Sequence, residues 1–217
     1  MDVFLRKESL KEFILLYPIT TLIILVDLVA YFGLAFLSIN DKAAVAEIYS
    51  NYIFNGRMIS EGEWYRLITG NLLHSGVPHL LFNTFATFVF APPLEKLLGK
   101  LKFLVSYLLL GIGTGVFNYV IDPAFLAVGA SGAIFGLMGF YTFICIGKPN
   151  FFSSETKQGI FGMVVTSFLS GFLFENVSWL GHLGGFISGI LLGLLFSLLT
   201  PQLFAVSNVS NVESDIH

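Results

Sequence analysis

Four polar side chains of this largely apolar chain have the types and spacing of an acyl-transfer site. Ser131 lies in the stretch Gly-Ala-Ser-Gly, and His182 lies at the start of a second glycine-rich stretch. A serine hydroxyl is a weak nucleophile until an adjacent base, most often histidine, removes its proton. His79 and Asn83 are four residues apart, so on a helix both project from one face and can donate to a developing oxyanion. The four residues indicate a Ser131–His182 dyad, since no carboxylate has an obvious position beside His182 to complete a triad.

Glycines with the spacing of a helix-packing face could bring the serine to its base. The set around His182 recurs every four residues and consists of Gly181, Gly185, Gly189 and Gly193. The set that follows Ser131 consists of Gly132, Gly136 and Gly139. Glycine faces let two helix backbones approach closely. The spacing therefore predicts that helices beginning near 131 and 180 pack together, with Ser131 and His182 within reach of one another. The Ser131 N–H, unpaired at a helix start, would be a further oxyanion donor.

The elements that must position these residues are membrane-spanning helices. Only 12% of the 217 residues are charged, about half the share of a soluble domain, and the mean hydropathy is +0.82. We expect an all-α, polytopic membrane protein, because apolar runs near 20 residues can cross a bilayer. Six spans are predicted, at 13–37, 77–95, 103–121, 131–147, 158–174 and 180–199, with a long first loop at 38–75. The predicted organisation is a cytoplasmic segment 1–12, a membrane domain 13–199 and a flexible tail 200–217.

The placement of lysine and arginine predicts the orientation of the spans. Eight of these residues lie in the N-terminal segment and in the connections at 96–102 and 148–157, and three lie in the long first loop. Cytoplasmic loops carry the excess of Lys and Arg. Both termini are therefore expected in the cytoplasm. The second, fourth and sixth spans then begin on the outer side, which places all four candidate site residues there.

Three motifs in order resemble the rhomboid intramembrane serine proteases. They are "HSGVPHLLFN", "GASGAIFG" and "GHLGGFISG", and the resemblance runs from about Glu63 to Gly193. It implies a six-helix rhomboid-like bundle in which Ser131 is the nucleophile and His182 the general base. It further implies that His79 and Asn83 bind the oxyanion.

The resemblance also implies roles for supporting residues and for partners. "EWYRLITGNLLH" resembles the family's Trp-Arg motif, so Arg66 takes the arginine's structural role, and Glu95 matches a structural acid at the end of the second span. Phe135 occupies a position often held by a tyrosine that stacks on the base. The implied substrates are single-span membrane proteins in the bilayer. The implied lateral gate lies near the fifth span, where Phe168, Phe172 and Phe174 are candidates. A bacterial plasma membrane is the expected location.

Other readings remain open on the sequence alone. Ser131 could be a small packing residue, His182 a helix-bridging histidine and the His79–Asn83 pair an interhelical hydrogen bond. We expect no cofactor, no metal and no nucleic acid, because there is no His-Glu-x-x-His motif and no basic stripe. His74 and Asp27 are interpreted as structural hydrogen-bonding residues. The alternative functions are a catalytically silent rhomboid-like protein that binds membrane clients, and a small transporter, which Asp27 alone would suggest.

Overall fold

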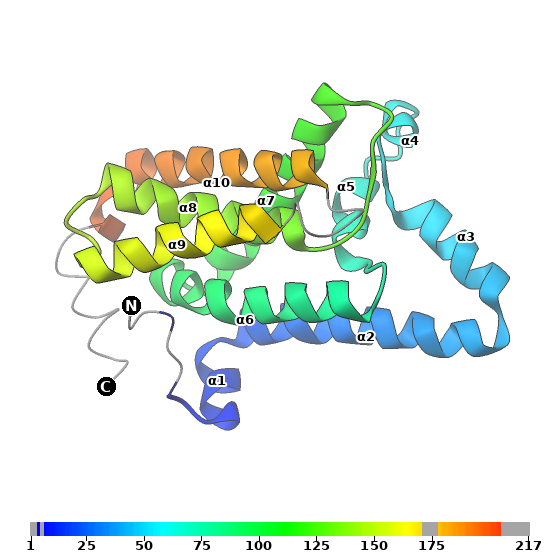
Figure 1. Ribbon diagram of the computed structural model, residues 1–217, viewed down its shortest axis with the longest axis horizontal. Helices are drawn as coiled ribbons and strands as arrows, with labels where there is room; N and C mark the ends of the chain where they lie inside the picture. Colours follow the sequence, from blue (N-terminus) through cyan, green and yellow to red (C-terminus); the bar gives the residue numbers. More distant parts are fainter. Residues whose placement is uncertain (1–3, 5–6, 171–177, 205–217) are drawn as a thin grey trace.

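Apolar helices dominate the part of the chain that the structure describes. The structure is a computed structural model describing residues 4, 7–170 and 178–204 (Figure 1). Four helices within these ranges are long and apolar enough to span a membrane: α2 (Pro18–Asn40), α6 (Val77–Leu98), α7 (Lys100–Ile121) and α10 (Trp179–Leu199). The shorter helix α8 (Ser131–Gly147) has the bounds of the predicted fourth span. Helix α9 (Ser154–Ser170) begins four residues before the predicted fifth span, 158–174, whose residues 171–174 lie outside the described ranges. The predicted all-α, polytopic architecture is confirmed.

The first predicted span, 13–37, is wrong at both of its ends. The chain forms α1 (Leu10–Leu16), turns at Tyr17, and begins α2 at Pro18. Proline favours the first turn of a helix and cannot donate within a continuous one, so the apolar run divides there. Helix α2 then continues to Asn40 and ends before Asp41, whose side chain accepts from the Ala44 N–H and caps the next helix. The first loop consequently begins at Asp41 rather than at 38.

The first turn of α2 is fixed by a buried carboxylate of α6. Glu95 is 2% exposed and accepts hydrogen bonds from the backbone N–H groups of Ile19 (2.8 Å) and Thr20 (2.7 Å) and from the Thr20 hydroxyl (2.7 Å). The first N–H groups of a helix have no partner within it and favour a negative charge. Glu95 thus ties the start of α2 to the end of α6.

Helix α8 is the central helix of the bundle and packs mainly against α10, with α7 and α6 on other sides. A Cβ atom on Gly189 would collide with the carbonyl oxygen of Gly136, and one on Gly185 with that of Gly132. The glycine-mediated packing predicted from the sequence spacing is therefore confirmed. Small residues here bring the α8 and α10 backbones into contact, as in other membrane bundles.

The first loop is built from short elements that reach the segment before Ser131. They are α3 (Lys42–Tyr52), β1 (Phe54–Asn55), α4 (Gly56–Ser60), α5 (Arg66–Thr69) and the 3-10 helix η2 (Gly70–Leu72). Strand β1 pairs antiparallel with β2 (Leu126–Ala127), and the N–H of Gly129 donates to the carbonyl of Gly70 at 2.9 Å. These bonds fix the backbone just ahead of α8.

Part of the C-terminal tail predicted as flexible is ordered against the bundle. Residues Pro201–Phe204 form the short 3-10 helix η3, and the Phe204 ring is buried beside Phe143 and Phe151. Residues 205–217 lie outside the described ranges. The division between domain and tail at residue 200 therefore stays a prediction for the remaining residues.

Candidate active site

The four candidate catalytic residues lie at the starts of three helices. Ser131 is the first residue of α8, His182 is in the first turn of α10, and His79 and Asn83 are in the first two turns of α6. These three helices begin at the same end of the bundle (Figure 1). The polar residues of three separate helices are thus brought to one region.

His182 lies over the first turn of α8. The Phe135 ring, one turn beyond Ser131, stacks on the His182 ring with a centroid separation of 3.9 Å and an interplanar angle of 10°. His182 is only 8% exposed. Among the described residues no hydrogen bond joins Ser131 to His182. Catalytic hydrogen bonds are often long in unliganded sites and shorten in the substrate complex. The stack on Phe135 places the largely buried His182 imidazole beside the N-terminal part of α8, the helix that Ser131 begins.

His79 and Asn83 face the backbone two residues before Ser131. A Cβ on Gly129 would lie 2.7 Å from His79 Nε2 and 3.5 Å from Asn83 Nδ2, so both nitrogens approach the same Cα. Gly129 has φ +110°, a conformation that residues with a side chain rarely adopt. Glycine is therefore required here both by its backbone angle and by the close approach of these two side chains.

The backbone at the start of α8 adds further donors. The Ala130 cap provides no side-chain hydrogen bond, and the first bond of the helix runs from the Ile134 N–H to the Ala130 carbonyl at 3.1 Å. The preceding N–H groups of the first turn have no partner within the helix and carry partial positive charge. The start of α8 thus carries the unpaired Ser131 N–H two residues after Gly129, which His79 Nε2 and Asn83 Nδ2 approach.

A small cavity lies beside Ser131. Its volume is about 40 Å³, and polar groups of Thr114, Asn118 and Ser178 contribute to its lining. Asn118 Oδ1 is buried without a hydrogen-bond partner among the described residues. A water molecule needs roughly 10–15 Å³ of such space and two or more polar partners. The region next to the serine can accordingly hold water, which a hydrolytic reaction consumes.

His74 packs beside the site from the first loop. The side-chain hydrogen bond expected for it is not found, since both ring nitrogens are buried without a partner in the described part of the chain. His74 is 1% exposed, its ring packs edge-on to His79 at 5.3 Å, and its carbonyl accepts a hydrogen bond from the Tyr49 hydroxyl. Burial, and secondarily the charge of His79, lowers the pKa of His74 to about 4. His74 is therefore neutral at pH 7. No cluster of three histidine, cysteine or acidic residues suited to a metal occurs among the described residues.

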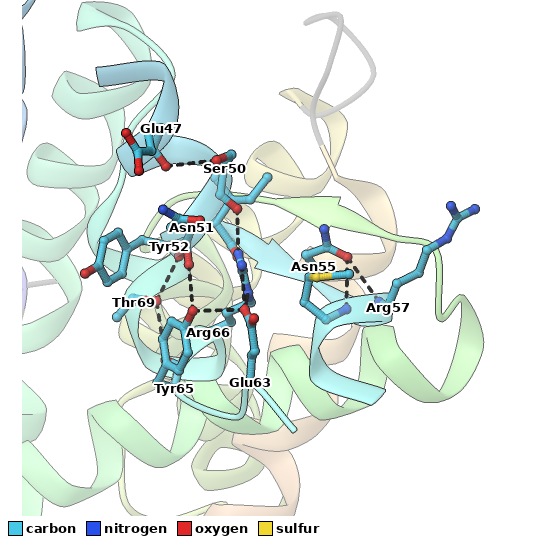
Figure 2. Close-up of polar contacts among 12 residues, drawn as sticks. Glu47, Ser50, Asn51, Tyr52, Asn55, Arg57, Glu63, Tyr65, Arg66 and Thr69 are labelled. Carbon is cyan, nitrogen blue, oxygen red and sulfur yellow. Dashed lines mark hydrogen bonds and ion pairs between the residues drawn. The ribbon is translucent and has the colours of Figure 1, made fainter. Parts of the chain in front are cut away.

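Arg66 and its partners form a polar cluster in the first loop (Figure 2). The buried guanidinium donates from Nε to Glu63 at 2.6 Å and from Nη1 to the carbonyls of Ser50 and Ile53 at 2.8 and 3.1 Å. Two hydrogen bonds lower the pKa of the Glu63 carboxyl, and the one from Arg66 has a larger effect than the one from Tyr65. Arg66 thus fastens the end of α3 to the segment before α5.

The phenylalanines expected at a gate and the hydrogen bond expected for Asp27 have different outcomes. Phe168 of α9 packs edge-on against Phe135, with ring centroids 4.8 Å apart, while the other gate candidates, Phe172 and Phe174, lie outside the described residues. The hydrogen bond expected for Asp27 is not found, since its buried Oδ2 has no partner in the described part of the chain. Asp27 and Tyr107 instead line a cavity of about 180 Å³ between α2 and α7.

One contact was missed at the sequence level. Ser75 contacts Nδ1 of His79, from its backbone N–H at 3.4 Å and its hydroxyl at 3.1 Å. The signal available was the spacing of four residues between a hydrogen-bonding side chain and His79. That spacing is common in sequences, so by itself it does not predict a contact between Ser75 and His79.

Comparisons with known proteins identify the family of the chain. A Rhomboid domain model matches residues 61–199. The chain is 37% identical to YdcA of Bacillus subtilis (strain 168) over 196 residues, which cover 89% of this chain and 96% of YdcA. It is 31% identical to the rhomboid protease GlpG of Haemophilus influenzae over 144 residues, which cover 66% of this chain and 73% of GlpG. It is 35% identical to the rhomboid protease GluP of Bacillus subtilis over 132 residues, 61% of this chain but only 26% of GluP.

The matched region contains all four candidate site residues and most of the helices described above. The family implied by the three sequence motifs is therefore confirmed. The four long apolar helices of this chain are suited to crossing a lipid bilayer. The chain belongs to the rhomboid family and is an integral, multi-pass membrane protein.

Proposed function

We propose that this protein is an intramembrane serine endopeptidase that uses a Ser131–His182 dyad. The observation that carries the proposal is the convergence at one end of the bundle of a helix-start serine, a stacked histidine and two aligned donors. Relatives named as rhomboid proteases support a proteolytic activity. No cofactor enters the chemistry.

The reaction follows from the positions of these groups. Ser131 Oγ attacks the scissile carbonyl while His182 accepts the hydroxyl proton. The new oxyanion receives hydrogen bonds from His79, Asn83 and the Ser131 N–H. His182 then gives its proton to the leaving amine as the C–N bond breaks, leaving an acyl group on Ser131. A water deprotonated by His182 hydrolyses this ester and returns the serine.

The substrates we propose are single-span membrane proteins. A transmembrane helix hides its peptide carbonyls in internal hydrogen bonds, so a segment with Gly or Pro near the membrane surface is easier to open. The lysine and arginine distribution supports both termini in the cytoplasm and a site toward the outer face of a bacterial plasma membrane. Water can reach a site at that depth.

The test uses the full chain reconstituted in liposomes with a model single-span substrate. Ser131→Ala and His182→Ala should each abolish cleavage, and a fluorophosphonate should label the wild type but not Ser131→Ala. Ser38→Ala is the matched control, because the Ser38 hydroxyl bonds only to a carbonyl of its own helix, Ala35. Wild-type turnover in either dyad variant would remove the proposal.

A client-binding protein without proteolysis is the second candidate. The observation that favours it is the missing hydrogen bond between Ser131 and His182 among the described residues. It predicts that the purified wild type binds single-span clients, takes no fluorophosphonate and cuts no substrate.

A further inference from the structure

The contact between Ser75 and His79 determines which ring nitrogen carries the proton. The Ser75 backbone N–H lies 3.4 Å from His79 Nδ1, and the Ser75 hydroxyl lies 3.1 Å from the same nitrogen. A backbone N–H can only donate, whereas a neutral imidazole has one donor and one acceptor nitrogen. Two contacts on Nδ1, one of them from an obligate donor, make Nδ1 the acceptor. The proton of the neutral ring then resides on Nε2.

The other edge of the same ring faces the oxyanion position. Nε2 is the ring nitrogen that approaches Gly129, where a Cβ would lie only 2.7 Å from it. The edge-on His74 ring, 5.3 Å away, restricts rotation of the imidazole. A proton on Nε2 therefore points toward the start of α8, while a proton on Nδ1 would leave a lone pair facing the negative oxygen.

We propose that Ser75 is a positioning residue that selects the Nε2–H tautomer of His79 and thereby makes this side chain a donor to the oxyanion. The proposal rests on the proposed function, since it needs an oxyanion to stabilise. The hydrogen bond made by one ring nitrogen commonly sets the protonation of the other. Ser75 itself touches no reacting atom, and its effect passes entirely through His79.

The first test reads the tautomer directly and needs no catalysis. Full-length protein carrying ¹⁵N-histidine in lipid nanodiscs gives imidazole nitrogen shifts, and the His79 signals are those absent from His79→Asn. The expected result is an Nε2–H tautomer in the wild type and a smaller Nε2–H fraction in Ser75→Ala, which loses the hydroxyl contact and keeps the backbone N–H contact. An Nδ1–H tautomer in the wild type, or a tautomer unchanged in Ser75→Ala, would overturn the proposal. This readout remains valid if the protein cuts nothing, so its failure is distinguishable from failure of the proposed function.

The second test measures cleavage. Loss of one oxyanion donor reduces kcat by about 10² to 10³, and the backbone N–H of Ser75 survives in Ser75→Ala. We therefore expect a smaller reduction of kcat, with KM unchanged. Ser75→Thr, which keeps the hydroxyl, should recover most of kcat, and Ser38→Ala should match the wild type.

A double-mutant cycle separates positioning from general damage. If Ser75 acts through His79, then Ser75→Ala should cause no further loss of kcat in a His79→Ala background. Equal losses of kcat in the wild-type and His79→Ala backgrounds would show that Ser75 acts elsewhere and would overturn the proposal.

Discussion

At the residue scale, Asn83 carries a buried amide that forms no hydrogen bond through Nδ2 among the described residues. Such a group lowers stability, because it loses its water without gaining a partner. Its placement near Gly129, shared with His79 Nε2, is explained if the missing partner is the oxyanion of a substrate. The residue would then be kept for the reaction at some expense to the fold.

Removal of the Asn83 amide is expected to lower activity without lowering stability. Asn83→Ala should lower kcat by about 10²-fold, the usual effect of removing one oxyanion donor, while the midpoint of unfolding stays equal or rises. The measurements are substrate cleavage in liposomes and thermal unfolding in detergent. A variant that loses stability in parallel with activity would show that Asn83 is a structural residue.

His74 provides a prediction about pH at the same scale. Its pKa is lowered from 6.5 to about 4 by burial, so the folded state binds the His74 proton more weakly than the unfolded state does. The stability that comes from a neutral His74 is complete above pH 6.5 and is lost as the pH falls toward 4. The difference corresponds to about 3 kcal/mol at most.

Unfolding midpoints of the wild type and His74→Asn, measured from pH 7 to pH 4, test this expectation. The wild type should lose stability more steeply than the variant over this range. Comparison of the two removes contributions from other titrating groups, which both proteins share. Parallel curves would show that His74 is not the group responsible.

At the element scale, contact between the α8 and α10 backbones fixes the start of α8, which carries Ser131, relative to the start of α10, which carries His182. A Cβ at Gly189 would meet the Gly136 carbonyl, while one at Gly33 of α2 would meet nothing within 4 Å. Gly189→Ala should therefore separate the helices and destabilise the protein by about 1–3 kcal/mol, as overpacking typically does. Gly33→Ala is the matched control and should be neutral or slightly stabilising.

Both glycine variants can be compared by thermal unfolding and by cleavage. Gly189→Ala should also reduce kcat, because the first turn of α10 carries His182. Retention of wild-type stability and kcat by Gly189→Ala would mean that the α8–α10 spacing adjusts easily and does not set the dyad geometry.

Glu95 is the second element-scale test, because it joins two helices through one carboxylate. Glu95→Ala leaves the N–H groups of Ile19 and Thr20 without their acceptor. Hydrogen bonds to a charged group contribute about 1.5–3 kcal/mol each, so a clear loss of stability is expected in detergent unfolding. The exposed Glu47 of α3 provides the control, and Glu47→Ala should have no effect. Equal midpoints for the two variants would contradict the capping role.

These elements also show what could be predicted from sequence. Hydropathy located the helices, and glycine spacing anticipated the α8–α10 contact, because both signals are local and repeated. The break at Pro18 was missed because apolar residues continue across it. The pairing of Phe54 with Ala127 could not be predicted, because it joins two-residue strands that lie 73 positions apart in the sequence. The environment of Asp27 likewise depends on distant helices.

At the scale of the whole molecule, the first loop and the membrane bundle meet at the segment that precedes Ser131. Arg66 ties α3 to α5, β1 pairs with β2, and the Gly70 carbonyl holds the Gly129 N–H. A disturbance at Arg66 should therefore reach the oxyanion site through the backbone. By this route, a loop residue outside the site is expected to influence the proposed catalysis without touching a substrate.

Arg66→Ala tests this connection. It removes a buried guanidinium and leaves the Ser50 and Ile53 carbonyls unpaired, so the loop should loosen. We expect faster backbone hydrogen exchange at 126–129 and a fall in kcat/KM of up to about 10²-fold, the effect of misplacing reacting groups by roughly 1 Å. Arg57→Ala is the matched control, since Arg57 lies exposed in the same loop and points away from this cluster (Figure 2). Faster exchange with an unchanged kcat/KM would separate the loop from the site and show that the bundle alone positions Ser131.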